Sequence, residues 1–475
     1  MVRVELIGHE NYYGLADVLR LFYGKVSEDR INRRVTCEGP DIEIISEAGS
    51  DVHTYLKGEK DQWDKIMKER FPSPVIPKRE VKRQLYHLLS MLEGKTFPWG
   101  SLTGIRPTIV AEEEKTSEAL IRDYLVRPDK ADLCMRVNRN EKDVLSRQDP
   151  SAMNIYIGVP FCPSRCAYCS FVSQDIGKHL DKLPLYADSL CAELSYIGPY
   201  IKDISTVYMG GGTPTVFSDR DFERVMEAIG DNLNLNERTE ITVEAGRADT
   251  ISDYKLKVMH EHNVRRICIN PQTMVDATLR RYNRAHSVED TVRVFEAARK
   301  TGFDVINTDL IAGLNIEEPE ELLYSLDRLF ELDPENITLH TLYKKRRADI
   351  SSSSVLGGKS AAEGLGDDRL DKTLSLAYEK LSAAGYEPYY MYRQKDTNHG
   401  LENVGFAKKG SECLYNVAMM SDKRNVAAFG AGSVSKRVFE GGRLERCSAP
   451  KDVICYMKDL RKHELDMIDF FGLDK

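Results

Sequence analysis

The segment Asn154-Ile-Tyr-Ile-Gly-Val-Pro-Phe-Cys-Pro-Ser-Arg-Cys-Ala-Tyr-Cys169 decides how the rest of the chain is interpreted. It leads from a short strand-like run into three cysteines, Cys162, Cys166 and Cys169, at C-x3-C-x2-C spacing. Three thiolates on one loop can hold three irons of a [4Fe–4S] cube and leave the fourth open to another ligand. A structural zinc site is the alternative, but zinc usually takes four Cys or His ligands, and no second such pair lies nearby in the sequence. The spacing therefore favours a cluster over zinc or unrelated thiols.

Downstream of the cysteines, strand-like and helical segments alternate. Strands are predicted at Thr206–Met209, Glu240–Ala245, Arg266–Asn270, Val305–Leu310 and Asn336–Leu342. Helices are predicted at Leu183–Ile197, Asp219–Ile229, Ser252–His262, Val288–Lys300 and Pro319–Leu332. With the strand before the cysteines this makes six βα units, so we expect an α/β fold with a partial (βα)6 TIM-type barrel. A Rossmann-like open sheet is the alternative, but Gly210-Gly-Gly-Thr-Pro214 lacks G-x-G-x-x-G spacing.

Glycines and polar residues stand at the predicted strand ends, where such folds carry their chemistry. The run Gly210–Gly212 leaves the backbone bare, so a ligand's ammonium can reach peptide carbonyls. Glu244 ends an apolar strand, where a carboxylate can pair with an ammonium or with ribose hydroxyls. Gln272 is presented at a strand tip, and Asp309 interrupts a buried strand, where an acid is costly unless it is paired or ligand-bound.

The cysteine loop resembles the signature of the radical S-adenosylmethionine (SAM) enzymes, in which SAM chelates the fourth iron. Tyr208-Met-Gly-Gly-Gly-Thr-Pro-Thr215 resembles their glycine-rich SAM segment. Glu244, Gln272, Arg284 and Asp309 follow at intervals seen in the oxygen-independent coproporphyrinogen III oxidases, or coproporphyrinogen dehydrogenases. The resemblance covers about residues 150–450, and the N-terminal part looks like the extension of the HemZ-type subgroup.

The resemblance implies one [4Fe–4S] cluster on Cys162, Cys166 and Cys169, with one or two SAM molecules. The cluster-bound SAM would contact Tyr156, Gly211, Gly212, Thr213 and Glu244. A second SAM would contact Tyr168, Gln272, Arg284 and Asp309, and of these Gln272, Arg284 and Asp309 are the candidate catalytic residues.

The reaction implied by the resemblance is the oxidative decarboxylation of two propionates of coproporphyrinogen III to vinyls. The product would be protoporphyrinogen IX, in haem biosynthesis, and a low-potential donor such as flavodoxin or ferredoxin would supply electrons. Guanidinium and ammonium groups hold carboxylates best. Arg281, Arg284 and the run Lys344-Lys-Arg-Arg347 are therefore candidates for the propionates, with a solvated loop as the alternative for that run.

Three positions depart from the best-known coproporphyrinogen dehydrogenases. Phe171 stands where a fourth cysteine follows the triad, Gly158 replaces a histidine, and Tyr415-Asn416 replaces a His-Asn pair. None of these changes removes a cluster ligand. Two other functions therefore stay open: a haem-binding chaperone or carrier, which the aromatic run Tyr389–Tyr392 also favours, and a radical SAM enzyme that modifies or degrades haem.

The chain is expected to have four parts. They are an N-terminal α/β domain of unknown role at residues 1–110, a helical connector at 111–150, the barrel at 151–345, and a mobile loop with a C-terminal α+β cover domain at 346–475. In the first part, Val2–Ile7 and Asp41–Ile45 alternate as strands do, and Val81–Leu92 has a helical apolar stripe before Gly94. The Ser- and Gly-rich run 351–366 predicts the mobile loop.

Composition sets the compartment and excludes some partners. The 475 residues are 41% hydrophobic and 30% charged, which is ordinary for a globular protein. Ten cysteines are too sparse for a disulfide scaffold, and a cluster needs reduced thiols, so we expect a cytoplasmic protein. The start lacks a signal-peptide pattern and no apolar run reaches membrane-spanning length. A net charge of −8 disfavours nucleic acid as a partner.

Overall fold

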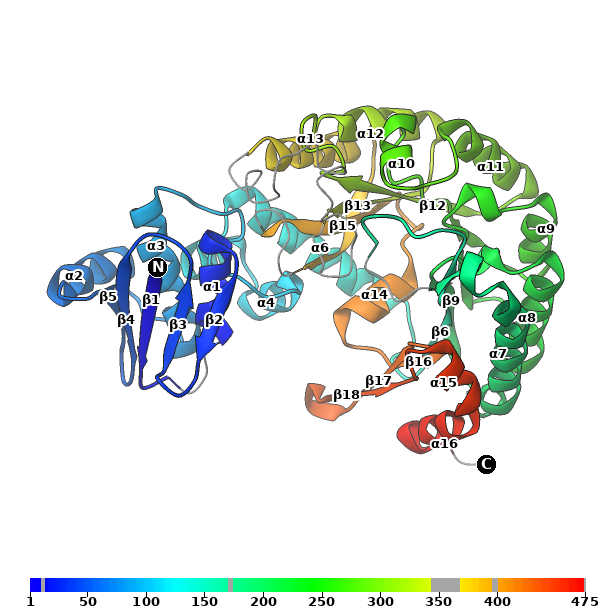
Figure 1. Cartoon of the computed structure of the whole chain (residues 1–475), viewed down its shortest axis with the longest axis horizontal. Helices are drawn as coiled ribbons and strands as arrows, with labels where there is room; N and C mark the ends of the chain where they lie inside the picture. The colour runs from blue at the N-terminus through cyan, green and yellow to red at the C-terminus, as the bar shows by residue number, and fades with distance from the viewer. Residues whose placement is uncertain (10–12, 170–173, 343–367, 395–399, 474–475) are drawn as a thin grey trace. The chain divides into compact units, whose positions relative to one another are not determined.

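The computed structural model describes residues 1–9, 13–169, 174–342, 368–394 and 400–473. Its contacts divide the chain into two compact units. The first comprises Met1–Asn138 with Met391–Glu402, and the second comprises Arg139–Tyr390 with Asn403–Lys475. The elements of both units are labelled in Figure 1.

The first unit contains a five-stranded sheet in the order β2-β3-β1-β4-β5. Its strands are β1 (Val2–Ile7), β2 (Val26–Asp29), β3 (Arg34–Cys37), β4 (Ile42–Ala48) and β5 (Val52–Leu56). β1 and β4 are parallel, and the other pairs are antiparallel. The accompanying helices are α1 (Tyr13–Tyr23), α2 (Lys60–Arg70) and α3 (Pro77–Glu93). The strands predicted near residues 2–7 and 41–45 are confirmed, whereas β2, β3, β5 and α2 were not predicted.

Helix α3 shows why this unit folds around its predicted apolar stripe. Pro77 begins the helix, where its missing N–H costs nothing, and Gly94 ends it in the left-handed conformation at φ 59°. Leu85, Leu88 and Leu89 are buried in a core shared with α1 and the sheet, whereas Leu92 at the end of the stripe is exposed. The helix predicted over 81–92 is confirmed.

Three helices follow in the region predicted as a helical connector. They are α4 (Pro107–Glu114), α5 (Ser117–Tyr124) and α6 (Pro128–Ser146). Thr116 caps α5 by accepting a hydrogen bond from the Ala119 N–H, and Leu125 ends α5 in the left-handed conformation. α5 and α6 are separate helices, because α5 ends at Tyr124 and α6 begins at Pro128.

An eleven-stranded sheet runs through the second unit, in the order β14-β15-β13-β12-β11-β10-β9-β6-β16-β17-β18. Six of its strands are mutually parallel and follow chain order. They are β6 (Met153–Val159), β9 (Ile204–Gly211), β10 (Glu240–Glu244), β11 (Arg266–Cys268), β12 (Val305–Ala312) and β13 (Asn336–Thr341). Parallel order requires a crossover after each strand, and all the crossing segments carry helices.

The crossover helices pack along one side of this sheet, as Figure 1 shows. They are α7 (Leu183–Ile197), α8 (Asp219–Asn232), α9 (Asp253–Glu261), α11 (Val288–Thr301) and α12 (Glu321–Leu332), and α13 (Arg369–Ala383) follows β13. The apolar faces of α7, α8, α9 and α11 and side chains of the strands from β6 to β12 share one buried core. The predicted alternation of strands and helices is confirmed. A short helix, α10 (Asp276–Arg281), was not predicted.

The barrel itself is not shown by the hydrogen bonds. Within the described residues, the sheet is open, with β14 (Glu387–Arg393) and β18 (Leu444–Ser448) at its two ends. The structure thus shows an α/β fold with a large mixed sheet, in which the six parallel strands keep the predicted order.

The C-terminal strands join this sheet at both ends of the parallel block. β15 (Glu402–Ala407) pairs antiparallel with β13, and β16 (Val426–Phe429) pairs parallel with β6. β17 (Val434–Val438) and β18 continue antiparallel from β16. The helices of this part are α14 (Leu414–Ser421), α15 (Val453–Lys458) and α16 (Leu460–Phe471). Strand β6, which leads into the cysteines, is therefore an interior strand between β9 and β16.

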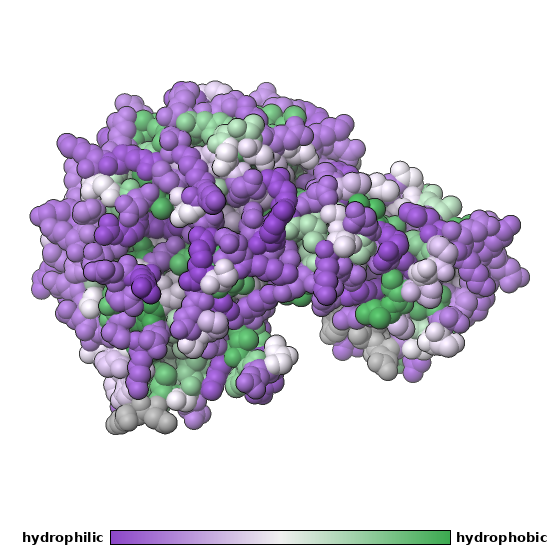
Figure 2. All heavy atoms as spheres, turned by 180° about the vertical axis from the view of Figure 1, so that it is seen from behind, coloured by the Kyte–Doolittle hydropathy of each residue, from purple (hydrophilic) through white to green (hydrophobic). Residues whose placement is uncertain are grey.

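Several predictions fall on residues outside those described. They concern the mobile loop at 351–366, the basic run at 344–347 and Phe171. Within the described ranges, no helix combines the length and apolar character needed to cross a bilayer. The face drawn in Figure 2 is mainly hydrophilic, with apolar residues in scattered areas.

Candidate functional site

The cysteine loop begins at β7 (Phe161–Cys162) and is tied to the glycine run after β9. The Gly212 N–H donates to the Val159 carbonyl at 2.8 Å, and the Thr213 N–H donates to the Phe161 carbonyl at 2.7 Å. The Thr213 hydroxyl also donates to the Cys162 sulfur at 3.6 Å. These contacts bring together Cys162, Gly212 and Thr213, three of the candidate site residues.

Two arginine side chains face the sulfur of Cys166, the buried cysteine of the triad. Arg247 Nη1 lies 3.8 Å and Arg284 Nη1 lies 3.9 Å from Cys166 Sγ. Both guanidinium groups are themselves buried. The Cys166 sulfur therefore lies within reach of N–H donors from two different segments of the chain.

Arg284 comes from the turn after α10 and joins several predicted site residues. Its guanidinium donates to the Tyr168 hydroxyl at 2.7 Å and to the carbonyls of Gly246 and Asn270 at 2.9 and 2.6 Å. Burial raises the pKa of Tyr168 well above its usual range, although the Arg284 charge opposes the shift. Arg284 therefore links the ends of β10 and β11 to the cysteine loop.

The same turn also holds the backbone of the cysteine loop. The Ala167 N–H donates to the Tyr282 carbonyl at 3.1 Å, and Asn283 Nδ2 donates to the Arg165 carbonyl at 2.8 Å. Asn283 adopts a left-handed backbone at φ 59°, which asparagine tolerates better than most residues. This turn, which the sequence did not single out beyond Arg284, is a support for the loop.

Glu244 stands at the end of β10, where its carboxylate accepts two hydrogen bonds. The Tyr208 hydroxyl donates to Oε1 at 2.5 Å, and the Gly211 N–H donates to Oε2 at 3.2 Å. Burial raises the pKa of Glu244 to about 7, with the Asp309 charge adding to the shift and the Tyr208 hydrogen bond opposing it. The carboxyl group can therefore change protonation near neutral pH.

Three tyrosine rings stack beside Glu244. Tyr208 and Tyr415 have ring centroids 4.6 Å apart at an interplanar angle of 20°. Tyr156 stacks on the two at 6.4 and 6.1 Å. The stack joins β6, β9 and the start of α14, so a C-terminal residue becomes part of the predicted SAM site.

The glycine run is required by contacts within the chain. A Cβ on Gly210 would lie 2.8 Å from the Glu244 carboxyl group, and one on Gly212 would lie 2.5 Å from the Phe161 carbonyl oxygen. Gly211 has φ +113°, and a Cβ there would lie 3.2 Å from the Tyr156 hydroxyl. The glycines thus let Glu244, Tyr156 and the cysteine loop approach one strand end.

Gln272 follows β11 and forms an isolated parallel bridge with Leu310 of β12, next to Asp309. The Gln272 N–H donates to the Asp309 carbonyl at 2.9 Å, and Gln272 has a left-handed backbone at φ 71°. Asp309 Oδ1 accepts from Asn307 Nδ2 at 2.9 Å, and Oδ2 lies 3.6 Å from His340 Nε2. A carboxylate in a buried strand is unfavourable unless it is paired, and Asn307 and His340 supply such partners for Asp309.

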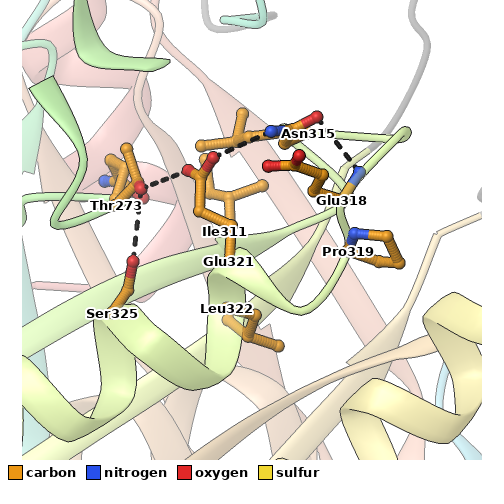
Figure 3. Close-up of a pocket in the computed structure, with 11 residues that line it drawn as sticks. Thr273, Ile311, Asn315, Glu318, Pro319, Glu321, Leu322 and Ser325 are labelled. Carbon is orange, nitrogen blue, oxygen red and sulfur yellow. Dashed lines mark hydrogen bonds between the residues drawn. The ribbon is translucent and has the colours of Figure 1, made fainter. Parts of the chain in front are cut away.

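A small hollow lies next to Gln272, between the residues after β11 and the start of α12 (Figure 3). Glu321 lies at its centre and accepts hydrogen bonds from Thr273 at 2.7 Å, Thr278 at 2.8 Å and Asn315 at 3.0 Å. These donors satisfy the Glu321 carboxylate. They thereby attach the start of α12 to the segments around Thr273, Thr278 and Asn315. Of the predicted site residues, Gln272 lines it.

The fit of these residues to a cluster and SAM rests on their donor chemistry. Within the described ranges, no three His, Cys, Asp or Glu side chains lie close enough together to hold a metal ion. The guanidinium groups beside Cys166 nevertheless suit an anionic sulfur ligand. The side-chain oxygens of Asn270 and Gln272 and Arg284 Nε are buried and make no hydrogen bond, so polar capacity remains at these strand ends.

Comparison with known proteins decides the family. The oxygen-independent coproporphyrinogen-III oxidase-like protein HemZ of Bacillus subtilis is 33% identical over 451 residues, which cover 88% of each chain. The chain belongs to the HemZ family. The radical SAM superfamily model matches residues 156–327 of this HemZ-family chain. Membership of that superfamily implies a [4Fe–4S] cluster and SAM.

Two further proteins are similar to this chain. The heme chaperone HemW of Lactococcus lactis is 34% identical over 58% of this chain and 68% of that protein. The solved structure of coproporphyrinogen III oxidase HemN from Escherichia coli has a TM-score of 0.53 and 20% identity, covering 68% of this chain and 72% of that one. That likeness supports the α/β fold with its large mixed sheet.

Sequence reasoning missed three residues of the site in this HemZ-family chain: Tyr208, Arg247 and Tyr415. Tyr208 stands two residues before Gly210, so alternation along β9 was a usable signal. Arg247 follows Glu244 by three residues at a strand end, where a basic residue is a signal of the same kind. Tyr415 was noted as a departure from a pattern, but no local signal placed its ring against β9.

Proposed function

We propose that this HemZ-family chain is an oxygen-independent coproporphyrinogen III dehydrogenase. It would decarboxylate two propionates oxidatively to vinyls and release protoporphyrinogen IX. The observation that carries the proposal is the pair of guanidinium groups on Cys166 Sγ, at 3.8 and 3.9 Å, in the loop of the cysteine motif. The names of the HemZ and HemN relatives support the substrate class.

In this proposal, Cys162, Cys166 and Cys169 ligate one [4Fe–4S] cluster. When bound, the cluster and SAM supply the radical that removes a hydrogen from a propionate β-carbon, which side chains cannot do. The chain's own task is to bind, aim and keep water out. The partly buried strand ends around Glu244 and Arg284 suit that task.

Glu244 would receive the cationic part of SAM, together with Tyr156, Gly211, Gly212 and Thr213. An ammonium or sulfonium beside the Glu244 carboxylate favours its ionised form, and the free group has a pKa of about 7. Binding near pH 7 would therefore release a proton from Glu244 in part of the molecules. The Tyr208 and Gly211 donors would hold the carboxylate in place.

Gln272, Arg284 and Asp309 would position a second SAM or the substrate, with Tyr168 held by Arg284. Basic side chains such as Arg281 would hold propionates. The proposal includes a partial (βα)6 curvature of the parallel strands and a C-terminal part that covers the site. It also includes a low-potential electron donor as partner and a cytoplasmic location.

A haem chaperone is the second candidate, and two observations favour it. HemW chaperones match 58% of this chain, at 28% and 34% identity. A Cβ on Gly158 would lie 3.3 Å from the Phe429 carbonyl oxygen and from the Tyr156 ring, so the histidine of the dehydrogenase pattern would need the neighbours to shift. Radical modification of haem is the third candidate, because the same differences from the coproporphyrinogen dehydrogenase pattern leave it open.

Mass spectrometry after strictly anaerobic incubation with coproporphyrinogen III, SAM and a reductant tests the proposal. We expect a vinyl product and released carbon dioxide, with 5′-deoxyadenosine formed alongside. Stoichiometric haem binding with no macrocycle product would replace the proposal with the chaperone. A haem-derived product of altered mass would replace it with haem modification.

A further inference from the structure

Arg247 has no assigned role, although it is one of the most deeply buried charges at the site. Its side chain is 4% exposed, and it lies just after β10, before the short turn Ala248–Thr250. The Thr250 hydroxyl donates to the Arg247 carbonyl at 2.9 Å, which fixes the backbone at this point. A buried guanidinium needs partners for its five N–H groups, and the identity of those partners indicates what it does.

One side of the guanidinium is held by a carboxylate fork. Arg247 Nε donates to Asp249 Oδ1 at 2.9 Å and Nη2 donates to Asp249 Oδ2 at 2.8 Å. His286 Nδ1 lies 3.5 Å from the same carboxylate. Burial alone would raise the pKa of Asp249, but His286 and Arg247 together hold it well below its usual range, so Asp249 is ionised. A bidentate pair of this kind fixes the plane of the guanidinium.

The other side faces the cysteine loop. Arg247 Nη1 lies 3.1 Å from Ser164 Oγ, 3.4 Å from the Ser164 carbonyl and 3.8 Å from Cys166 Sγ. The ion pair with Asp249 is therefore a dipole whose positive end faces the sulfur. Arg284 approaches the same sulfur at 3.9 Å from a different turn. Two separate segments thus supply N–H donors to one thiol.

We infer that Arg247 is a positioning residue of the iron–sulfur site, which holds the cysteine loop and makes the bound cluster easier to reduce. Hydrogen bonds and positive charge at a ligating sulfur stabilise the reduced, more negative state of such clusters. The inference rests on the proposed function only in requiring that the loop binds a cluster.

The test compares the reconstituted full chain with Arg247→Met, Arg247→Lys and, as a matched control, Arg224→Met. Arg224 also pairs with carboxylates, those of Asp188 and Asp221, but lies on α8 and donates to no cysteine of the loop. The readouts are iron and sulfide per chain, the rate of iron loss to a chelator, and the midpoint potential from a redox titration followed by electron paramagnetic resonance. Thermal melting of each variant reports whether it folds.

Arg247→Met should give a more negative midpoint potential and faster iron loss. Arg247→Lys should keep the potential near the wild-type value, because it keeps the charge, and still lose iron faster, because lysine cannot hold both Asp249 and Ser164. Arg224→Met should match the wild type. A folded Arg247→Met that binds no iron would support the positioning role, and the charge effect would then be read from Arg247→Lys against Arg247→Gln.

Wild-type potential and iron retention in Arg247→Met would overturn the inference. So would an equal negative shift in Arg247→Met and Arg224→Met, since that would be a general charge effect. If the wild-type chain itself binds no cluster, the proposed function fails instead. If it binds a cluster but makes no vinyl product, the inference about Arg247 is unaffected.

Discussion

The hydroxyl of Tyr208 donates to the carboxylate of Glu244 at 2.5 Å, across the ends of two neighbouring parallel strands. Tyr415 from the C-terminal part stacks on Tyr208 and shields the pair. Burial raises the pKa of Glu244 to about 7 although the Tyr208 hydrogen bond opposes the shift, so the protonation of Glu244 depends on pH near neutrality.

Glu244 should make the free protein less stable as pH rises. Its pKa is raised from the usual 4.5 to about 7 on folding, so the folded state binds more protons between these values. The free energy of unfolding should fall by about 3 kcal/mol across that window, and Glu244→Gln should remove the fall. Denaturant unfolding at several pH values measures this, with the exposed Glu237→Gln as the control. Parallel curves for the wild type and Glu244→Gln would contradict the prediction.

Cys166 should be essential for cluster binding. Anaerobic reconstitution of the wild type should give about four irons per chain and reductive cleavage of SAM. Cys166→Ala should lose both, whereas Cys455→Ala, which changes an exposed cysteine outside the loop, should keep them. Iron analysis and detection of 5′-deoxyadenosine make the measurement. A Cys166→Ala protein that retained both would end the cluster assignment.

Arg284 should separate product formation from SAM cleavage. Arg284→Ala removes the donors to Tyr168 and to the Gly246 and Asn270 carbonyls, so the strand ends lose their alignment. Vinyl product should fall by about 100-fold or more, while the cluster spectrum and uncoupled SAM cleavage partly survive. Arg280→Ala on the exposed side of α10 is the control. Unchanged vinyl formation in Arg284→Ala would count against the role.

Gly212 should not tolerate a side chain. The added Cβ of Gly212→Ala would lie 2.5 Å from a backbone oxygen of Phe161, which cannot rotate away, so we expect a loss of about 1–3 kcal/mol in the free energy of unfolding. Gly246→Ala is a matched control at the same site, because its Cβ would make only ordinary contacts, at 3.6 Å and beyond. Equal stability of the two variants would show that the loop can move to make room.

The parallel order of six strands followed from sequence because each βα unit carries its own apolar periodicity. Single residues also marked the ends of elements correctly: Gly94 ends α3, and Glu244 stands at the end of β10. The contacts of Tyr415 and Arg247 could not be predicted from local sequence, since they depend on how segments far apart in the chain pack together. The pairing of β16 with β6 has the same origin, because no local pattern announces a partner strand far along the chain. The domain boundaries at 110, 150 and 345 stay predictions.

Strand β16 closes the edge of β6 with residues made much later than the cysteine loop. Asn425 contacts Asn154 across 271 residues of sequence. A chain still on the ribosome therefore carries the whole cysteine motif for much of its synthesis beside a bare strand edge, which is open to wrong pairing. Tyr415 likewise cannot stack on the Tyr208 ring until the C-terminal part has been synthesised. Iron delivery in the cell should accordingly follow completion of the chain, and a chain cut short near residue 420 should aggregate rather than load metal.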